Sequence, residues 1–269
     1  MTAGATTTPA LLRGHRTGEG VFETLRLDRD VRLVAPPGWS LHLDRMRRGA
    51  ARMDLPWPGD AAVRAALGAA QATQPAVALR ARVTLWADGG DPRHEAPERA
   101  ALTAESTPLA ADDVAPRPWT LAWGGRVRNP AARLWDCKHV ALAESLSWRR
   151  LARAAGADDA LLCAVDGQVS EATTSTAIFG LGDGRIVTPG PAAAPLPGTS
   201  LARLRAALPI AAAIVRPDDL DRATWAVLVN AVWGVRTVER IDTVPLRPPP
   251  AAWLAHARRA LDPVGSGHP

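Results

Sequence analysis

The chain has 269 residues, enough to bury a sizeable core in one large domain or two modest ones. Hydrophobic residues make up 47% and charged residues 22%, as in ordinary globular enzymes, and no apolar run is long enough to span a membrane. The net charge of +5 comes from arginines interleaved with acidic residues, which argues against a nucleic-acid-binding protein but leaves that alternative open.

Hydrophobic periodicity predicts a mixture of strands and helices in the first part of the chain. Strands are expected at residues 21–27, 31–34 and 77–86, and helices at residues 40–55 and 61–72. The strand at 77–86 alternates, with Leu79, Ala81, Val83 and Leu85 on one face and Arg80, Arg82 and Thr84 on the other. It is therefore expected to bury one face and to present cations on the opposite one.

The same mixture returns after a stretch that contains Ala, Asp and two prolines. Strands are expected at residues 119–123, 159–165, 176–181, 186–188, 225–229 and 235–241. Helices are expected at residues 141–155, 198–208 and 251–261. We therefore predict an α+β fold in two lobes, with a small N-terminal α+β domain at 1–108, a linker at 109–118 and a larger C-terminal α+β domain at 119–269.

Cysteine usage and the N-terminus indicate the compartment. Cys137 and Cys163 form neither a disulfide framework nor a metal-ligand pattern, so no metal site is expected. Residues 1–10 lack the basic and apolar regions of a secretory signal. We predict a cytoplasmic protein without membrane or nucleic-acid partners.

Lys138 is the single lysine of a chain that carries 32 basic residues. A Schiff base requires a primary amine, which arginine cannot supply. Lys138 lies in a largely apolar stretch, and partial burial would lower its pKa and leave the amine nucleophilic near neutrality. A chance surface lysine is the alternative interpretation.

Glu171 follows Lys138 after a predicted strand and an Asp-Gly turn. This arrangement delivers a carboxylate to a fixed place. A carboxylate facing the ring nitrogen of pyridoxal phosphate keeps that nitrogen protonated and the ring a good electron sink. A plain turn-flanking glutamate is the alternative.

A predicted helix opens with Gly198, Thr199 and Ser200. The glycine permits close approach, and the two hydroxyls lie beside the free N–H groups at the positive end of the helix, which suits a phosphate. Arg45 could add a charge-assisted contact. Simple helix capping is the alternative for the hydroxyls.

Taken in order, these segments resemble the class IV aminotransferase family, which includes branched-chain and D-amino-acid aminotransferases and 4-amino-4-deoxychorismate lyase. The resemblance runs from near the N-terminus to about Val238. It is carried by Gly-Glu-Gly-Val-Phe-Glu-Thr at 18–24, His-Leu-Asp-Arg at 42–45, Lys-His-Val at 138–140, Asp-Gly-Gln-Val-Ser-Glu at 166–171, Leu-Pro-Gly-Thr-Ser at 196–200 and Asn-Ala-Val-Trp-Gly-Val-Arg-Thr-Val at 230–238.

The resemblance implies a fold-type IV enzyme of the D-amino-acid aminotransferase-like kind, with pyridoxal 5'-phosphate between the lobes. Lys138 would be the catalytic lysine. The cofactor-binding residues would be Arg45, Lys138, Glu171, Thr176, Gly198, Thr199, Ser200, Asn230 and Ala231. A homodimer acting on a small amino substrate is also implied.

The substrate side departs from the family pattern. Thr176 stands where the family usually has Asn, and the chain contains no Tyr. The family's loop arginine binds a substrate carboxylate in some members, and Arg93 is the candidate here, with Trp86 and Trp233 as neighbours of the substrate.

The segment at 230–238 most resembles the lyase version of the family. It favours a 4-amino-4-deoxychorismate lyase-like reaction, in which pyruvate is eliminated and 4-aminobenzoate is formed. The alternatives are an aminotransferase for a D- or branched-chain amino acid or a specialised-metabolism amine, and a non-catalytic relative.

Overall fold

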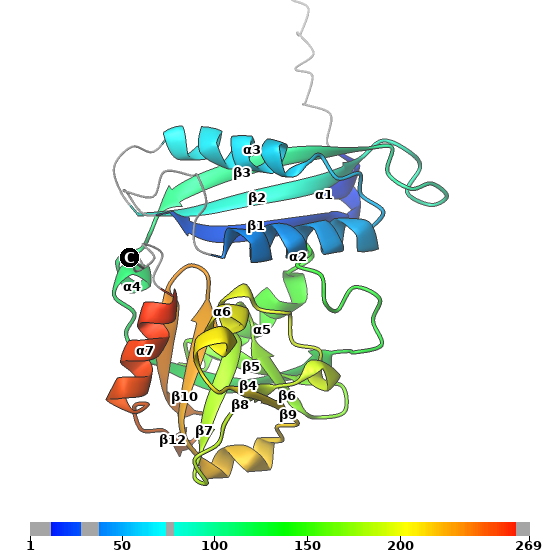
Figure 1. Ribbon diagram of the computed structural model, residues 1–269. Coiled ribbons are helices and arrows are strands. Elements are labelled where there is room, and N and C mark those ends of the chain that lie inside the picture. The colour runs from blue at the N-terminus through cyan, green and yellow to red at the C-terminus, as the bar shows by residue number, and fades with distance from the viewer. Residues whose placement is uncertain (1–11, 28–37, 74–77, 262–269) are drawn as a thin grey trace, which may run out of the picture.

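The computed structural model describes residues 12–27, 38–73 and 78–261, which form two lobes stacked one on the other (Figure 1). The N-terminal lobe holds a three-stranded antiparallel sheet in the order β1 (Gly20–Leu27), β2 (Leu79–Asp88) and β3 (Arg99–Pro108). Three helices accompany it: α1 (Arg13–Thr17), α2 (Trp39–Arg52) and α3 (Asp60–Ala72).

Strand alternation decides which face of this sheet is buried. The predicted apolar face of β2 is confirmed, because Leu79, Ala81, Val83 and Leu85 are all buried in one cluster with the apolar stripes of α2 and α3. The opposite face carries Arg80 and Arg82 and is left to face the C-terminal lobe.

The C-terminal lobe is built on a nine-stranded mixed sheet in the order β6-β5-β4-β11-β10-β7-β8-β9, with β12 paired to β11. Its strands are β4 (Trp119–Arg128), β5 (Asp159–Ala164), β6 (Val169–Ala172), β7 (Thr176–Leu181), β8 (Ile186–Pro189), β9 (Ala211–Ala213), β10 (Ala223–Asn230), β11 (Gly234–Ile241) and β12 (Val244–Pro245). Its helices are α5 (Ala143–Ala154), α6 (Thr199–Ala207) and α7 (Ala251–Leu261), with short 3₁₀ turns η1 (Pro191–Ala193) and η2 (Pro217–Arg222).

Strand β10 shows why the centre of this sheet is apolar on both faces. Ala226 and Leu228 join one core cluster, while Trp225 and Val227 join another that includes α6 and α7. Such a strand reads as a continuous apolar run rather than an alternating one.

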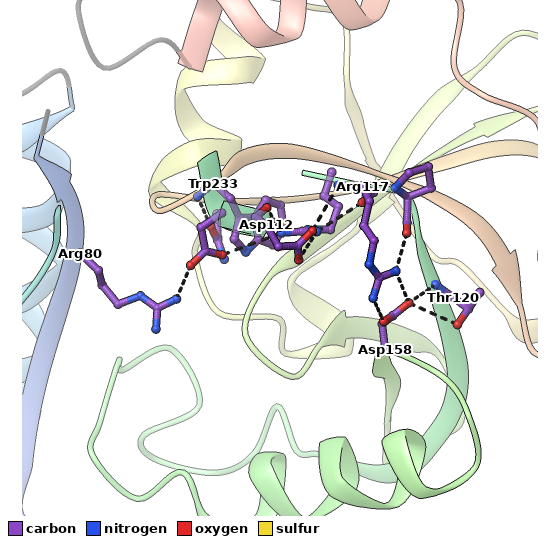
Figure 2. Close-up of polar contacts among 10 residues, drawn as sticks. Arg80, Asp112, Arg117, Thr120, Asp158 and Trp233 are labelled. Carbon is purple, nitrogen blue, oxygen red and sulfur yellow. Dashed lines mark hydrogen bonds and ion pairs between the residues drawn. The ribbon is translucent and has the colours of Figure 1, made fainter. Parts of the chain in front are cut away.

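The segment between the lobes is tied to both of them. It contains the short helix α4 (Ala111–Val114), and Arg236 of β11, which is fully buried, donates to the Asp112 carboxylate at 2.8 Å and to the Asp112 carbonyl at 3.0 Å. Figure 2 shows Arg80 reaching toward the same segment from the N-terminal strands, where it pairs with Asp113 at 2.9 Å. The guanidinium carbon of Arg236 also lies 4.1 Å from the ring centroid of Trp119.

The two-lobed α+β prediction is confirmed, with differences in detail. Strand β3 was missed because it is an edge strand rich in Ala, Thr, Ser and Glu and only partly buried, so it lacks an apolar signal. The predicted linker contains α4 rather than irregular chain alone. The division at 1–108, 109–118 and 119–269 stays a prediction, and the strand predicted at 31–34 lies outside the described residues.

Within the described ranges, no helix is long and apolar enough to cross a membrane. In the same ranges, His, Cys, Asp and Glu side chains form no group of three or more that could hold a metal ion.

Replacing Asp112 with alanine should lower the free energy of unfolding by about 1.5 kcal/mol, because it removes the nearer carboxylate of the buried Arg236 guanidinium and leaves only Asp113, 3.8 Å away. Denaturant unfolding of the wild type and Asp112→Ala measures the change. Arg133→Ala is the control, because it removes an exposed pair with Asp54 and should cost under about 1 kcal/mol. Equal losses in the two variants would contradict a stabilising role of the Arg236–Asp112 pair.

Candidate active site

A cavity of about 800 Å³ brings most of the predicted site residues together. Its lining draws on both lobes, including β1, β2, α2 and the turn between β10 and β11. The volume suits a cofactor and a small substrate. The predicted residues that line it are Arg45, Lys138, Glu171, Thr176, Gly198, Thr199, Ser200, Asn230, Ala231 and Trp233.

Lys138 lies between β4 and α5, and its backbone is fixed against β1. Its carbonyl accepts a hydrogen bond from the Phe22 N–H at 2.9 Å, and its Nζ lies 4.5 Å from the Phe22 ring centroid. Burial, reinforced by the positive charges of Arg45 and Arg82, lowers the pKa of Lys138 to about 8. A substantial fraction of the amine is therefore neutral and nucleophilic near physiological pH.

Glu171 on β6 is the buried carboxylate of the cavity. It pairs with Arg128 at 3.0 Å. Burial raises the pKa of Glu171, although Arg128, the Leu196 N–H and Lys138 oppose the rise. The carboxylate and the Lys138 amine thus interact electrostatically across one cavity.

Arg45 belongs to a buried trio with Glu23 and His42. Its Nε and one terminal nitrogen both bind the Glu23 carboxylate at 2.7 Å, and His42 Nδ1 lies 2.6 Å from the same carboxylate. Burial opposes ionisation of Glu23, but Arg45 and His42 hold its pKa at about 2. The other terminal nitrogen of Arg45 donates to the Pro197 carbonyl at 2.8 Å, so the trio also positions the loop before α6.

The start of α6 forms a cradle for a small anion. Gly198 precedes the helix, and a Cβ there would lie 2.6 Å from Thr176 Oγ1, so only glycine leaves this space open. Thr199 and Ser200 are buried in the first turn, where backbone N–H groups have no helical acceptor.

The residues present fit pyridoxal phosphate. Three buried polar atoms, Arg128 Nε, His139 Nδ1 and Ser175 Oγ, have no hydrogen-bond partner within the described chain, and all three residues line the cavity. Unsatisfied polar atoms of this kind are costly unless a polar ligand or water meets them. Together with the amine of Lys138 and the cradle at Gly198, they match a polar, phosphorylated aldehyde.

Asn230 and Ala231 shape the turn between β10 and β11. Asn230 Oδ1 accepts the N–H groups of Val232 and Trp233 at 3.0 and 3.1 Å, so its side-chain oxygen already holds the turn. The Ala231 carbonyl accepts the N–H of Arg26 from the N-terminal lobe at 3.2 Å. The turn therefore closes the cavity and joins the lobes.

Two predicted substrate residues are not brought to this cavity. The indole N–H of Trp86 donates to Thr103 Oγ1 at 2.9 Å, and its ring packs against His15. The Arg93 side chain is 79% exposed and pairs with Asp91 at 2.9 Å. Neither residue lines the cavity of its own chain, and their substrate role stays a prediction.

Sequence reasoning missed several cavity cations, among them Arg82, Arg128 and Arg149. Alternation placed Arg82 on the polar face of its strand, which was an unused signal. Arg128 lies in the part of β4 beyond the predicted strand end at residue 123, and no sequence signal pointed to Arg149.

The cavity carries more cations than carboxylates. Arginine lining residues outnumber acidic ones, and four of the arginines have carboxylate partners: Arg45, Arg80, Arg117 and Arg128. The remaining three, Arg82, Arg149 and Arg153, have no carboxylate at ion-pair distance in the described part of the chain. The cavity is thus suited to an anionic ligand.

Comparison with known structures supports the same fold. A hypothetical aminotransferase from Mycobacterium tuberculosis, in its PLP-bound form, is 21% identical with a TM-score of 0.82 over 97% of this chain and 95% of that chain. A Legionella pneumophila protein provisionally named 4-amino-4-deoxychorismate lyase is 19% identical with a TM-score of 0.78 over 93% and 94%. Escherichia coli branched-chain amino acid aminotransferase is 15% identical with a TM-score of 0.80 over 94% and 88%.

No curated protein matches the sequence. The family model for class IV amino-transferases matches residues 20–241. This match covers most of the chain, and it agrees with the two lobes and the cavity between them. The chain therefore belongs to the class IV aminotransferase family, whose members are pyridoxal-phosphate-dependent aminotransferases and lyases.

Proposed function

We propose that this enzyme is a lyase of the 4-amino-4-deoxychorismate type, which releases pyruvate and 4-aminobenzoate. The observation that carries the proposal is the surplus of arginine in the cavity. Each product carries one carboxylate, so the substrate carries two. Arginines without carboxylate partners are suited to binding such a dianion.

Several residues would hold pyridoxal phosphate. Lys138 would form the Schiff base, Glu171 would face the ring nitrogen, and the cradle formed by Gly198, Thr199 and Ser200 would receive the phosphate. Arg45 would act through the Pro197 carbonyl as well as by its own charge. When bound, the cofactor ring withdraws electrons from the carbon attached to the substrate nitrogen.

Lys138 is the residue placed to move the proton. An amine with a pKa of about 8 is close to the ideal strength for a general base at neutral pH. Its Nζ would take the proton from the carbon next to the substrate nitrogen. Phe22, packed against the amine, keeps water from one side of it.

Glu171 would keep the ring nitrogen protonated. Burial raises the pKa of the Glu171 carboxyl, and Arg128 opposes that rise, so Arg128 favours the ionised carboxylate that would stabilise a protonated ring nitrogen. Removing Arg128 would leave the carboxylate buried without its cation.

An aminotransferase is the second candidate. A Mycobacterium tuberculosis neighbour, 24% identical with a TM-score of 0.79, has been seen with α-ketoglutarate and PMP bound. An arginine-rich cavity would also accept the carboxylates of a keto acid. The two reactions differ in whether a keto acid must be supplied. In either case a cytoplasmic homodimer stays our expectation.

The enzyme loaded with pyridoxal phosphate should release pyruvate from 4-amino-4-deoxychorismate without an added keto acid. Lactate dehydrogenase and NADH report the pyruvate, and 4-aminobenzoate should form in equal amount. Lys138→Ala should lose at least about a thousandfold in rate, because the general base is removed. Arg185→Gln, an exposed change at the β7–β8 turn, should leave the rate unchanged. Turnover that requires added α-ketoglutarate would instead favour the aminotransferase.

Lys138 should titrate near pH 8 in the folded, cofactor-free protein. Because it is the only lysine, reductive methylation with ¹³C-formaldehyde labels a single side chain besides the N-terminus. Its NMR shift against pH should show a midpoint well below the ordinary value, and unfolding in urea should restore that value of about 10.4. A folded-state midpoint equal to the unfolded one would show that the cavity does not desolvate the amine.

A further inference from the structure

Arg82 lies on β2 with its side chain in the cavity, and it forms no ion pair with the carboxylate of the neighbouring strand. Arg82 is directly opposite Glu105 of β3, a cross-strand position where opposite charges normally pair. No ion pair forms there. The guanidinium carbon lies instead 3.9 Å from the ring centroid of Phe22, on the strand at the other side of β2.

This orientation brings Arg82 close to the reacting amine. Lys138 Nζ lies 4.5 Å from the same Phe22 ring centroid, so the two cations are no farther apart than the sum of the two distances. The charge of Arg82 is also one of the causes that lower the pKa of Lys138. Two like charges are held together around one aromatic ring.

The hydrogen bonds of Arg82 leave most of its donors unused. Its only hydrogen bond in the described chain runs from Nε to Thr84 Oγ1 at 3.3 Å. Both terminal nitrogens are left with four N–H donors in a planar fork, which matches the geometry of a carboxylate. Arg80, Arg117 and Arg128 differ, since each already binds a carboxylate.

Burial makes this arrangement costly without a ligand. Burial lowers the pKa of Arg82, and Glu105 opposes the change only at a distance. Arginine stays charged under these conditions, so a half-desolvated cation lies beside a second one. An anion bound to the Arg82 guanidinium would reduce the repulsion.

We propose that Arg82 is the specificity-determining residue of the cavity, whose terminal nitrogens bind a carboxylate located within a few bonds of the substrate amine. The inference rests on the proposed function, because it assumes that an amino substrate reacts at Lys138. Substrate recognition is thereby assigned to Arg82 on β2, which lines the cavity, and not to Arg93, which lies outside it.

Binding of a carboxylate at Arg82 also changes the pKa of the Lys138 amine. Arg82 lowers the pKa of Lys138, so a carboxylate that neutralises Arg82 raises that pKa again. The amine becomes a stronger base when a substrate with the correct carboxylate is present. An amine without a carboxylate gains no such increase.

Binding of pyruvate and its neutral analogue pyruvamide to the pyridoxal-phosphate-loaded protein tests the assignment by isothermal titration calorimetry. The wild type should bind pyruvate more tightly than pyruvamide. Arg82→Gln should weaken pyruvate binding at least about tenfold, as expected for loss of a hydrogen-bonded charge pair, and leave pyruvamide unaffected. Arg82→Lys should restore part of the affinity, because it keeps the charge but not the fork.

A second readout follows the amine itself in cofactor-free protein. Arg82→Gln should raise the pKa of labelled Lys138 above about 8, and the exposed Arg185→Gln should leave it unchanged. Equal pyruvate affinity in the wild type and Arg82→Gln, or equal binding of pyruvate and pyruvamide by the wild type, would overturn the inference. Failure of the proposed function appears separately, as an inability to load pyridoxal phosphate or to turn over an amino substrate.

Discussion

The short pairing between β1 and the segment that carries Lys138 holds the site together. Phe22 N–H binds the Lys138 carbonyl, and Val140 N–H binds the Gly20 carbonyl at 3.0 Å, so Val21 and His139 form an isolated antiparallel bridge. Two backbone hydrogen bonds therefore fix a loop of the C-terminal lobe to a strand of the N-terminal lobe. Because of this pairing, the Lys138 amine lies against Phe22 and close enough to β2 for the charge of Arg82 to act on it.

Charge is then arranged around that fixed amine. The C-terminal lobe supplies Glu171 with Arg128, and the N-terminal lobe supplies Arg82 and the trio of Glu23, His42 and Arg45. Each arginine with a buried carboxylate partner stabilises the fold, since breaking such a pair leaves an uncompensated charge. Arginines without such partners are available for ligands. Arginine therefore stabilises the fold at some positions and is available to bind a ligand at others.

Sequence reasoning reached the cofactor side of the site more fully than the substrate side. Lys138 is conspicuous as the single lysine, Glu171 and Gly198 lie close to a turn and a helix start, where sequence signals are strong, and all three line the cavity. Trp86 and Arg93 were chosen by loop resemblance, and the loop instead closes on itself through Asp91. Alternation placed Arg82 on the polar face of its strand, but it could not show that this side chain, rather than another on the same face, bends toward Phe22.

The fold shows the same limit. Strands with continuous apolar runs, such as β10, were found, while the polar edge strand β3 was missed because its stability comes from ten paired positions with β2 rather than from its own side chains. The lobe arrangement depends on Arg236 and Asp112, which are distant in sequence and carry no local signal. Contacts between distant residues are what a single sequence specifies least directly.

The central claim is that Lys138 holds pyridoxal phosphate, and borohydride reduction of the loaded protein tests it most directly. The account predicts a visible absorption band that borohydride removes, with the reduced cofactor's mass found only on the peptide containing Lys138. Lys138→Ala should show neither the band nor the mass. A wild-type protein that takes up no cofactor, or a Lys138→Ala variant labelled to the same extent, would contradict the account.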